Sequence, residues 1–437
     1  MNKAWMGALA LLLAACSATR APAPAVPSGR EVGRDISREV LAPNDGWAAA
    51  GPGTRGGADA APAQVFEVRD RNELAKAFAA GDVPKIVRVS GRIDLSVDDA
   101  NKPLAFNDYR DPAFDFEAYL KAYDPAIWGK KPVTGPLEEA RQRSSKKQAE
   151  RVVLRVPSNT TLVGLGADAR IENGSLFLDK VSNIIIRNLH FADAYDFFPA
   201  WDPKDNANGE WNSEYDNVML RGATNVWVDH CSFTDGKRPD HTARVALGRP
   251  MQHHDGFLDI TQQSNFVTVS FNHFQNHDKT NLVGSSDSQK LDDGKLKVTF
   301  HHNFWENTKE RAPRVRYGEV HVYNNLYAGG NGGPQQPYGY SIGVGFSSHV
   351  FSEHNVWETS ADVRAEQLAK LWKGTAFFDR GSLHNGRPVD LFAALKGANP
   401  SVTLSPDVGW TPSLHGPVQG ADQVASEVRR SAGAGRL

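Results

Sequence analysis

The sequence has little net charge. Its 437 residues include 49 Lys and Arg against 51 Asp and Glu, a formal net charge of −2. A strongly basic protein that binds nucleic acid through its overall charge is therefore not expected. A locally basic groove remains compatible with this balance, because net charge does not describe how charges are distributed.

The N-terminus lacks an apolar run long enough to cross a membrane. Lys3 precedes the short apolar run Met6–Leu13, whereas a membrane span needs about 20 apolar residues. This arrangement is typical of an export signal, which we predict over residues 1–15. The run ends in Leu13-Ala14-Ala15-Cys16, which resembles the lipobox of bacterial lipoproteins. The resemblance implies that a lipidated Cys16 attaches the mature protein to a membrane. An ordinary cleaved signal is the alternative, and both predict export to the outside or the surface of a bacterium.

Cysteine is scarce, with two residues in the whole chain. If Cys16 is lipidated, Cys231 has no partner and no disulfide can form. An exported protein without disulfides depends on its hydrophobic core for stability, and a chain of this length can bury a large one.

Alanine, proline and glycine dominate residues 16–63. The stretch Ala21–Pro27 predicts an extended tether, although Gly46-Trp47 could already pack on the domain. We predict a tether over residues 16–63 and one domain over residues 64–437.

The first part of that domain mixes helix and strand. Asn72 is expected to cap a helix over residues 73–79, followed by a strand over 85–89. Residues 94–150 have the composition of an insertion, with helical segments over 114–123 and 137–150.

Short strands then recur through the chain. Val226–Phe233 has two alternating apolar residues, then a small and an aromatic residue. Similar copies cover residues 184–191, 267–274, 298–305, 320–327 and 350–357. A short unit with irregular insertions is typical of a solenoid, and strands this short predict an all-β parallel β-helix. A β-propeller or sandwich is the alternative, which the irregular spacing and the lack of hairpin dipeptides disfavour.

Asparagine recurs near one position of the unit, at residues Asn188, Asn272, Asn303, Asn325 and Asn355. Stacked Asn side chains can hydrogen-bond between neighbouring coils, because the amide both donates and accepts. Cys231 occupies this position in its own copy, so we interpret it as a small buried residue and not as a nucleophile.

Three aspartates are candidate metal ligands. Asp255 and Asp259 would lie about 13 Å apart in a straight strand at roughly 3.3 Å per residue, but Gly256 permits a bend that brings them closer. Asp216 would come from the preceding coil. A site made of carboxylates favours a hard cation such as calcium.

Four cations follow these acids: Lys279, Arg311, Arg314 and Arg316. Pro313 stiffens the segment that holds the arginines, and the guanidinium fork matches carboxylates. For Arg314, a structural ion pair is an equally good interpretation. The adjacent pairs His253-His254 and His301-His302 are poor candidates for a zinc site, because strand neighbours face opposite sides and one of each pair should be exposed.

Several ordered blocks resemble the signatures of pectate lyases of polysaccharide lyase family 1. These blocks are Asn225–His230, Asp255–Ile260, His277–Lys279 and Arg311–Gly318. The likeness extends from about residue 54 to about residue 360 and includes the 94–150 insertion and the 201–216 loop. It implies a right-handed parallel β-helix that acts on polygalacturonate, with calcium bridging enzyme and substrate.

Position by position, the resemblance makes Asp216, Asp255 and Asp259 the Ca²⁺ ligands, Arg311 the catalytic base, and Lys279 and Arg316 the substrate-binding cations. It implies β-elimination from unesterified pectate to 4,5-unsaturated oligogalacturonides by a monomer. Because arginine is normally protonated, neighbouring cations and calcium would have to lower the pKa of Arg311.

Three other functions remain open. A polygalacturonase-like hydrolase could use the aspartates as acid and base, but it has no use for the Arg311–Arg316 segment. Pectin lyases resemble the family but lack the calcium carboxylates. A non-catalytic surface adhesin could bind polygalacturonate along a solenoid face.

Overall fold

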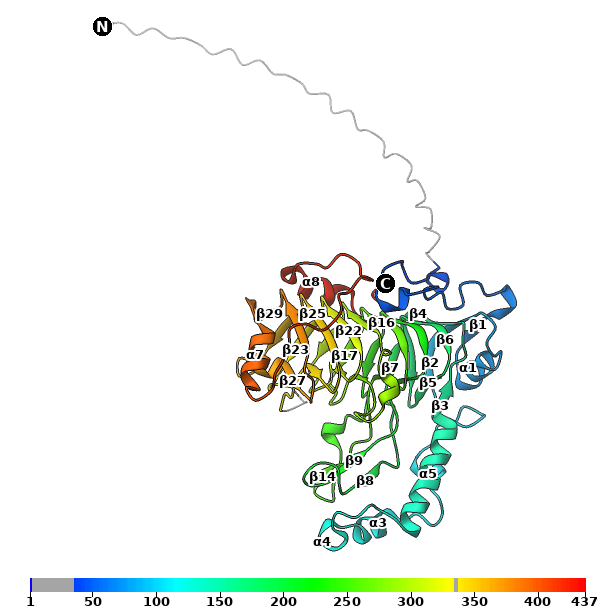
Figure 1. The fold of residues 1–437 in the computed structure, drawn as a ribbon. Coiled ribbons are helices and arrows are strands. Elements are labelled where there is room, and N and C mark those ends of the chain that lie inside the picture. The colour runs from blue at the N-terminus through cyan, green and yellow to red at the C-terminus, as the bar shows by residue number, and fades with distance from the viewer. Residues whose placement is uncertain (2–34, 334–336) are drawn as a thin grey trace. The chain divides into compact units, whose positions relative to one another are not determined.

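The computed structural model describes Met1, residues 35–333 and residues 337–437. Residues 36–437 form one compact unit, built of short strands stacked in successive coils (Figure 1). The rest of the predicted signal peptide, Cys16 and the Ala21–Pro27 stretch lie outside the described residues. In the part that is described, no helix is long and apolar enough to cross a membrane.

Most coils contribute one strand to an eight-stranded sheet and two strands to an 18-stranded sheet. The eight-stranded sheet contains β3 (Val153–Arg155), β5 (Ser175–Asp179), β10 (Val218–Arg221), β15 (Leu258–Thr261), β18 (Leu282–Val283), β21 (Arg314–Val315), β24 (Ile342–Val344) and β27 (Ala369–Leu371). The larger sheet contains β1 (Val65–Val68), β2 (Lys85–Asp94), β4 (Thr160–Glu172), β6 (Ser182–Arg187), β7 (His190–Ala192), β11 (Thr224–Asp229), β12 (Ser232–Thr234), β16 (Asn265–Ser270), β17 (His273–Gln275), β19 (Val298–His301), β20 (Phe304–Glu306), β22 (Glu319–Tyr323), β23 (Leu326–Gly329), β25 (His349–Glu353), β26 (Val356–Thr359), β28 (Phe377–Arg380), β29 (Leu383–His384) and β30 (Arg387–Pro388). Strands of successive coils pair in parallel, as β11 does with β16 and β16 with β19. The predicted right-handed parallel β-helix is confirmed.

The remaining elements are hairpins and helices. The hairpins are β8 (Ala200–Asp202) with β9 (Glu210–Asn212) and β13 (Val245–Ala246) with β14 (Arg249–Pro250). The α-helices are α1 (Arg71–Phe78), α2 (Phe106–Tyr109), α3 (Phe116–Ala122), α4 (Pro125–Trp128), α5 (Pro136–Val152), α6 (Ala365–Leu368), α7 (Leu391–Ala398) and α8 (Ala421–Ser431). The short 3-10 helices are η1 (Ile36–Arg38), η2 (Trp47–Ala49), η3 (Pro62–Gln64), η4 (Asp240–Thr242) and η5 (Lys290–Asp292).

The core is a set of ladders along the coil axis. Val226, Val267, Val298 and Val320 lie in register on neighbouring rungs and are fully buried. Such a ladder follows directly from the apolar-x-apolar repeat, because alternate strand residues face the interior.

The predicted asparagine ladder is also present. The side chain of Asn272 donates to Asn303 at 3.1 Å, Asn303 to Asn325 at 3.1 Å, and Asn325 to Asn355 at 3.0 Å. Cys231 continues this ladder, and its backbone N–H donates to Asn272 Oδ1 at 2.9 Å. Burial raises the pKa of the Cys231 thiol to about 12, so it remains protonated.

Asn188 was wrongly placed in this ladder. It stands one residue earlier, at the left-handed corner of the coil with φ of 55°, as does His230 with φ of 47°. The ladder position of that coil belongs to Leu189, which is fully buried. Asn is common at both kinds of position. At the ladder position its amide hydrogen-bonds to the neighbouring coil, and at the corner it tolerates a positive φ.

The structure differs from the predicted tether over residues 36–63. Ala48 and Leu41 pack against the larger sheet, and the backbone N–H of Ala48 donates to Thr268 Oγ1 at 3.0 Å. A Cβ at Gly46 would lie 2.4 Å from that same oxygen, in a backbone conformation with φ of 79°. A composition rich in Ala and Gly therefore permits close packing here. Gly46-Trp47 belongs to this packed segment, as the sequence had allowed.

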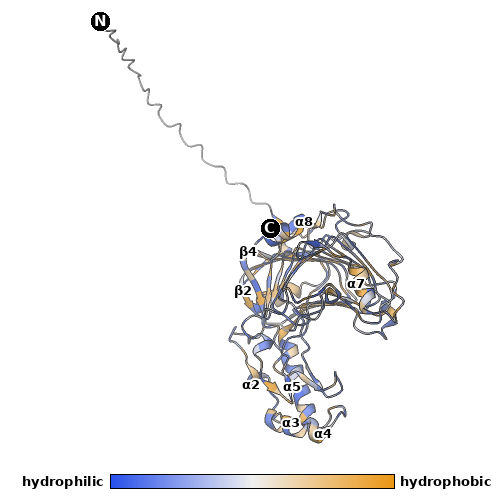
Figure 2. Ribbon diagram, turned by 90° about the vertical axis from the view of Figure 1, so that its left-hand side faces the viewer, coloured by the Kyte–Doolittle hydropathy of each residue, from blue (hydrophilic) through white to orange (hydrophobic). Residues whose placement is uncertain are grey.

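The inserted segment forms an arm. Helices α2–α5 pack on the β8–β9 hairpin through buried aromatic side chains that include Tyr119, Phe198 and Trp211. Figure 2 shows these helices extending from one side of the coils. Helices α3 and α5 match the predicted segments to within two residues. Helix α1 begins earlier than expected, because Asp70 and not Asn72 caps it by accepting from the Glu73 N–H.

The chain after residue 360 continues the solenoid. Strands β27, β28 and β29 pair in parallel with the preceding coil, and α7 covers its end with Leu391 and Leu395. Helix α8 packs Val424 and Val428 against the larger sheet. Strands and helices thus both form the end of the solenoid.

Candidate active-site cleft

The candidate residues gather on the outer face of the eight-stranded sheet. Asp259 on β15, Leu282 on β18, Arg314 on β21, Gly343 on β24 and Lys370 on β27 occupy equivalent places on successive strands. In a parallel sheet such residues share one face. The acidic and basic candidates therefore form a row along the coil axis.

The three aspartates come together at the bend before β15. Asp216 Oδ1 accepts from the Gly256 N–H at 2.7 Å, and Asp259 Oδ1 accepts from the Leu282 N–H at 2.9 Å. A Cβ at position 256 would lie 2.5 Å from Asp259 Oδ1 and 2.8 Å from Asp216 Oδ1. This close approach favours glycine here, whereas the sequence had indicated Gly256 for a bend that brings the aspartates together.

Burial sets the charge of this acidic group. Burial, and then the charges of Asp259 and Asp255, hold the pKa of Asp216 well above its ordinary value. Burial and the charge of Asp255 likewise raise the pKa of Asp259 to about 7. Burial opposes ionisation of Asp255 too, but Lys279 and Arg311 outweigh it and lower the pKa of that carboxyl. Asp216 and Asp259 therefore retain protons at a pH where ordinary carboxyls are ionised, whereas Asp255 is ionised.

Lys279 and Arg311 flank the acidic group. Lys279 Nζ donates to Asp255 Oδ1 at 3.0 Å, and the backbone of Lys279 pairs with Glu310 on the next coil. Arg311 has a left-handed backbone with φ of 61°. Its buried Nε makes no hydrogen bond within the described chain, and Glu310 Oε1 lies 3.4 Å away.

The pKa of Arg311 is raised and not lowered. Burial lowers it, but the charges of Glu310, Asp255 and Asp259 outweigh burial. This is the opposite of the shift that a base requires, and it depends on the aspartates being ionised and uncompensated.

Arg314 makes no ion pair within the described residues, so the interpretation as a structural salt bridge was wrong. Its guanidinium carbon lies 4.5 Å from the ring centroid of Trp372. Burial and then the charge of Arg316 lower its pKa. Arg316 itself pairs with Asp287 at 2.9 Å and donates from Nη1 to the Gly284 carbonyl at 2.8 Å.

A cleft of about 540 Å³ lies beside the acidic group. The candidates Lys279, Arg311 and Arg314 line it, whereas Arg316 and the three aspartates do not. The other lining residues are Asp205, Asn206, Glu210, Asn212, Arg249, Gln252, Asp278, Lys309, Glu310, Lys370 and Trp372. The β8–β9 hairpin thus forms the wall opposite the sheet. Sequence reasoning missed Lys370 and Trp372, for which the alternation Lys370-Leu371-Trp372 is the only signal.

Histidines support the acidic group from behind. His277 Nδ1 lies 2.7 Å from Asp235 Oδ1, and His277 Nε2 lies 2.5 Å from the Asp255 carbonyl. His254 bridges Asp193 and Asp240 at 3.1 and 2.9 Å.

The expectation that one histidine of each adjacent pair is exposed was wrong for His301 and His302, both of which are buried. His302 stands at the left-handed corner of its coil with φ of 53°. Strand alternation does not hold across that corner, so neighbouring side chains need not face opposite sides. Within the described ranges, no three His, Cys, Asp or Glu side chains form a ready metal-binding group.

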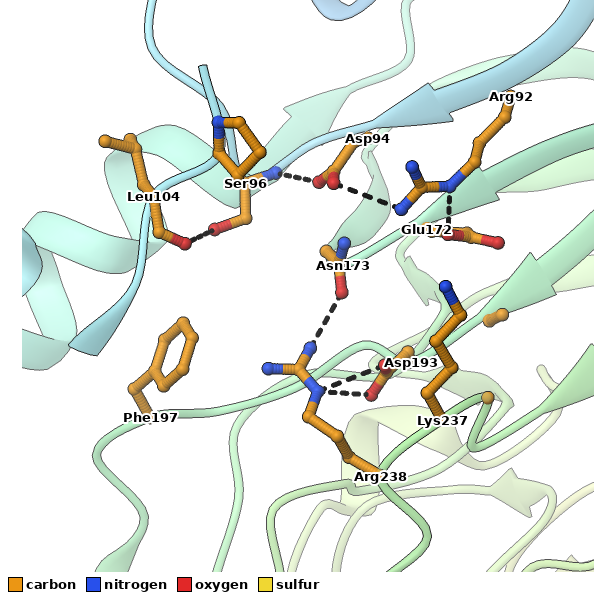
Figure 3. Close-up of a pocket in the computed structure, with 13 residues that line it drawn as sticks. Arg92, Asp94, Ser96, Leu104, Glu172, Asn173, Asp193, Phe197, Lys237 and Arg238 are labelled. Carbon is orange, nitrogen blue, oxygen red and sulfur yellow. Dashed lines mark hydrogen bonds and ion pairs between the residues drawn. The ribbon is translucent and has the colours of Figure 1, made fainter. Parts of the chain in front are cut away.

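A second cavity of about 350 Å³ lies beside the ends of β2 and β4 (Figure 3). Arg92 pairs there with Glu172 at 2.5 Å, and Arg238 pairs with Asp193 at 3.1 Å. Its two arginines are thus satisfied by the cavity's own carboxylates, whereas Arg314 and Lys370 of the main cleft make no ion pair with a described residue.

Fold and cleft together define a parallel β-helix protein with an extended, charged binding face. A family model described as "Pectate lyase" matches residues 36–113 and 133–436. The chain belongs to the pectate lyase family, and the match continues past the limit near residue 360 that the signature blocks indicated.

Individual relatives agree with this assignment. The chain is 47% identical to a pectate lyase of Bacillus subtilis over 92% of this chain and 94% of that protein. It is 36% identical to pectate lyase D of Dickeya chrysanthemi over 80% of each. A solved structure described as a pectate lyase bound to a hexasaccharide is 46% identical, with a TM-score of 0.89 over 92% of this chain and 100% of that one.

Proposed function

We propose that this protein is a lyase that cleaves de-esterified polygalacturonate by calcium-dependent β-elimination. The observation that carries the proposal is the buried acidic group directly beside Lys279 and Arg311. A polymer of uronic acids offers one carboxylate per sugar, which suits a cleft lined by Lys279, Arg311 and Arg314.

The donor set fits calcium. Asp216, Asp255 and Asp259 offer oxygen ligands only, as Ca²⁺ prefers. One oxygen of each is held by the protein, and the other accepts no hydrogen bond from the part of the chain that is described. Burial, and then the charges of neighbouring aspartates, raise the pKa values of Asp216 and Asp259, and a bound cation would offset both effects. When bound, calcium would supply positive charge beside the substrate carboxylate.

Different residues of the chain then bind the substrate and remove its proton. Lys279 and Arg316 bind uronate carboxylates, and Arg316 retains Nη2 for this purpose because Nε and Nη1 are engaged. Arg311 removes the C5 proton, the C4–O bond breaks, a C4–C5 double bond forms, and the departing oxygen receives a proton. No water is consumed.

Compensating the aspartates would lower the pKa of Arg311. Glu310 is the charge that raises it most, and Asp255 and Asp259 follow. With these neutralised, burial and the nearby Lys279 favour loss of the proton.

The decisive test is an ultraviolet assay on polygalacturonate with calcium and with chelator. We expect a conjugated unsaturated product with calcium and none with chelator. Cleavage without ultraviolet absorbance would indicate a polygalacturonase-like hydrolase, and binding without cleavage would indicate an adhesin. Equal rates on methylated pectin would indicate a pectin lyase.

We also propose that the protein is an exported monomer attached to a membrane through a lipidated Cys16. Fractionation of cells that express the wild type and Cys16→Ser tests this. Lipidation predicts that the wild type partitions with membranes and the variant does not. Light scattering of the soluble variant tests the monomer.

A further inference from the structure

Two cations at one end of the cleft have no acidic partner. Arg314 on β21 and Lys370 on β27 lie two rungs apart on the same face, which is about 10 Å at roughly 4.8 Å per rung. Neither makes an ion pair with any described residue. The other cleft cations differ, since Lys309 pairs with Asp278 at 3.3 Å and Arg249 pairs with Glu210.

A tryptophan holds these two cations in place. Arg314 Cζ lies 4.5 Å and Lys370 Nζ lies 4.4 Å from the Trp372 ring centroid. Gly343 on the intervening rung leaves the space that Arg314 crosses, because a Cβ there would lie 2.9 Å from Arg314 Cγ. Cation–π contacts of this kind orient a cation without neutralising it.

The arrangement costs stability unless an anion binds. Two like charges beside one ring repel each other, and burial already lowers the pKa of Arg314. Arg314, Lys370 and Trp372 line the same cleft as Lys279 and Arg311. A ligand that spans the cleft can therefore contact both groups.

We propose that Arg314, Lys370 and Trp372 form a further substrate subsite, which binds a uronate carboxylate and contacts the sugar ring beyond the units at Arg311. This inference rests on the proposed function. It makes Lys370 and Trp372 determinants of chain length: they stabilise long acidic chains and do not contact short ones bound at Arg311.

Kinetics on galacturonate oligomers of increasing length test this with Lys370→Met. We expect KM for polygalacturonate to rise about 5–20-fold, as for loss of one charge-assisted contact, with kcat unchanged. Short oligomers should be cleaved as by the wild type. Lys396→Met is the matched control, because Lys396 also contacts an aromatic ring, Phe392 at 5.9 Å, but on α7 outside the cleft.

Trp372→Ala should produce the same length-dependent loss. Equal kinetic constants at every length would overturn the subsite, and so would an equal loss at every length, which would indicate displacement of Arg311. Calorimetry in an Arg311→Lys background measures the affinity for long oligomers, and hence the contribution of the subsite, without turnover. There Lys370→Met should weaken binding, and unchanged binding would overturn the inference. Absence of unsaturated product from the wild type would instead refute the proposed function.

Discussion

The two ends of the cleft each gather charges of one sign on the same sheet face, negative at one end and positive at the other. Around β15, three aspartates are gathered, with Asp216 and Asp259 nearly inaccessible to solvent. Around β27, Arg314 and Lys370 remain partly open and rest on Trp372. Buried like charges are far more costly than open ones. The acidic end therefore shifts its pKa values, whereas the basic end leaves Lys370 exposed to solvent.

This difference indicates what each end binds. A compact acidic group needs a small divalent cation that reaches buried oxygens. A spread row of cations on an aromatic ring suits an extended polyanion. Arg311 lies beside the acidic end, and the charges of Glu310, Asp255 and Asp259 raise its pKa.

A change at Arg311 is expected to have the largest effect on activity. Arg311→Lys keeps the charge but not the guanidinium fork, so we expect kcat to fall about 10²–10⁴-fold, the usual contribution of a general base. Substrate should still bind. Steady-state kinetics across pH measure this, and wild-type activity should rise toward alkaline pH. A near-normal kcat, or a wild type most active near pH 5, would contradict the role of base.

Removing one acid tests the other end. Asp255→Ala or Asp259→Ala should abolish activity at low calcium and leave the fold intact, with metal affinity reduced by at least the roughly 10–100-fold that loss of an outer-shell partner costs. Calcium titration of activity, with circular dichroism for the fold, measures both. Asp422→Ala on α8 is the control. Wild-type activity of either variant in chelator would refute the calcium site.

Lys279→Ala tests whether Lys279 binds substrate or only stabilises the fold. Lys279 is largely buried and paired with Asp255, so the pair differs from an exposed salt bridge, which contributes about 0–1 kcal/mol. We expect KM for polygalacturonate to rise about 10-fold or more, since a hydrogen bond to a charged group such as a uronate carboxylate contributes about 1.5–3 kcal/mol. Unchanged kinetics would leave Lys279 a structural residue.

The smallest expected effect is on thermal stability. The folded protein raises the pKa of Asp259 to about 7, so without metal it holds a proton that the unfolded chain releases near pH 4. Stability should therefore fall as pH rises from about 4 to about 7, by a few degrees in Tm.

Calcium isolates the contribution of the acidic group. Asp196 and Asp379 also have a pKa raised to about 7 by burial, but they lie outside the proposed site. Calorimetry should show that calcium reduces the pH dependence and that Asp259→Ala removes the calcium-sensitive part. A calcium-independent profile identical to that of the variant would contradict the electrostatic account.

The periodicity of the sequence was sufficient to predict the fold. The valine repeat and the asparagine ladder are local patterns that recur coil by coil, so the sequence alone determined the solenoid, the burial of Cys231 and the candidate ligands. The same patterns misplaced Asn188, because Asn serves two neighbouring positions for different reasons.

Only the tertiary structure decided how distant residues share the cleft. Arg314 finds its partner Trp372 two coils later, and residues 36–63 pack on strands more than a hundred residues away. Contacts of this kind depend on the stacking register and not on local sequence. The pKa of Arg311 depends on burial and on its neighbour Glu310, and also on Asp255 and Asp259 from another coil, since electrostatic effects follow distance in space.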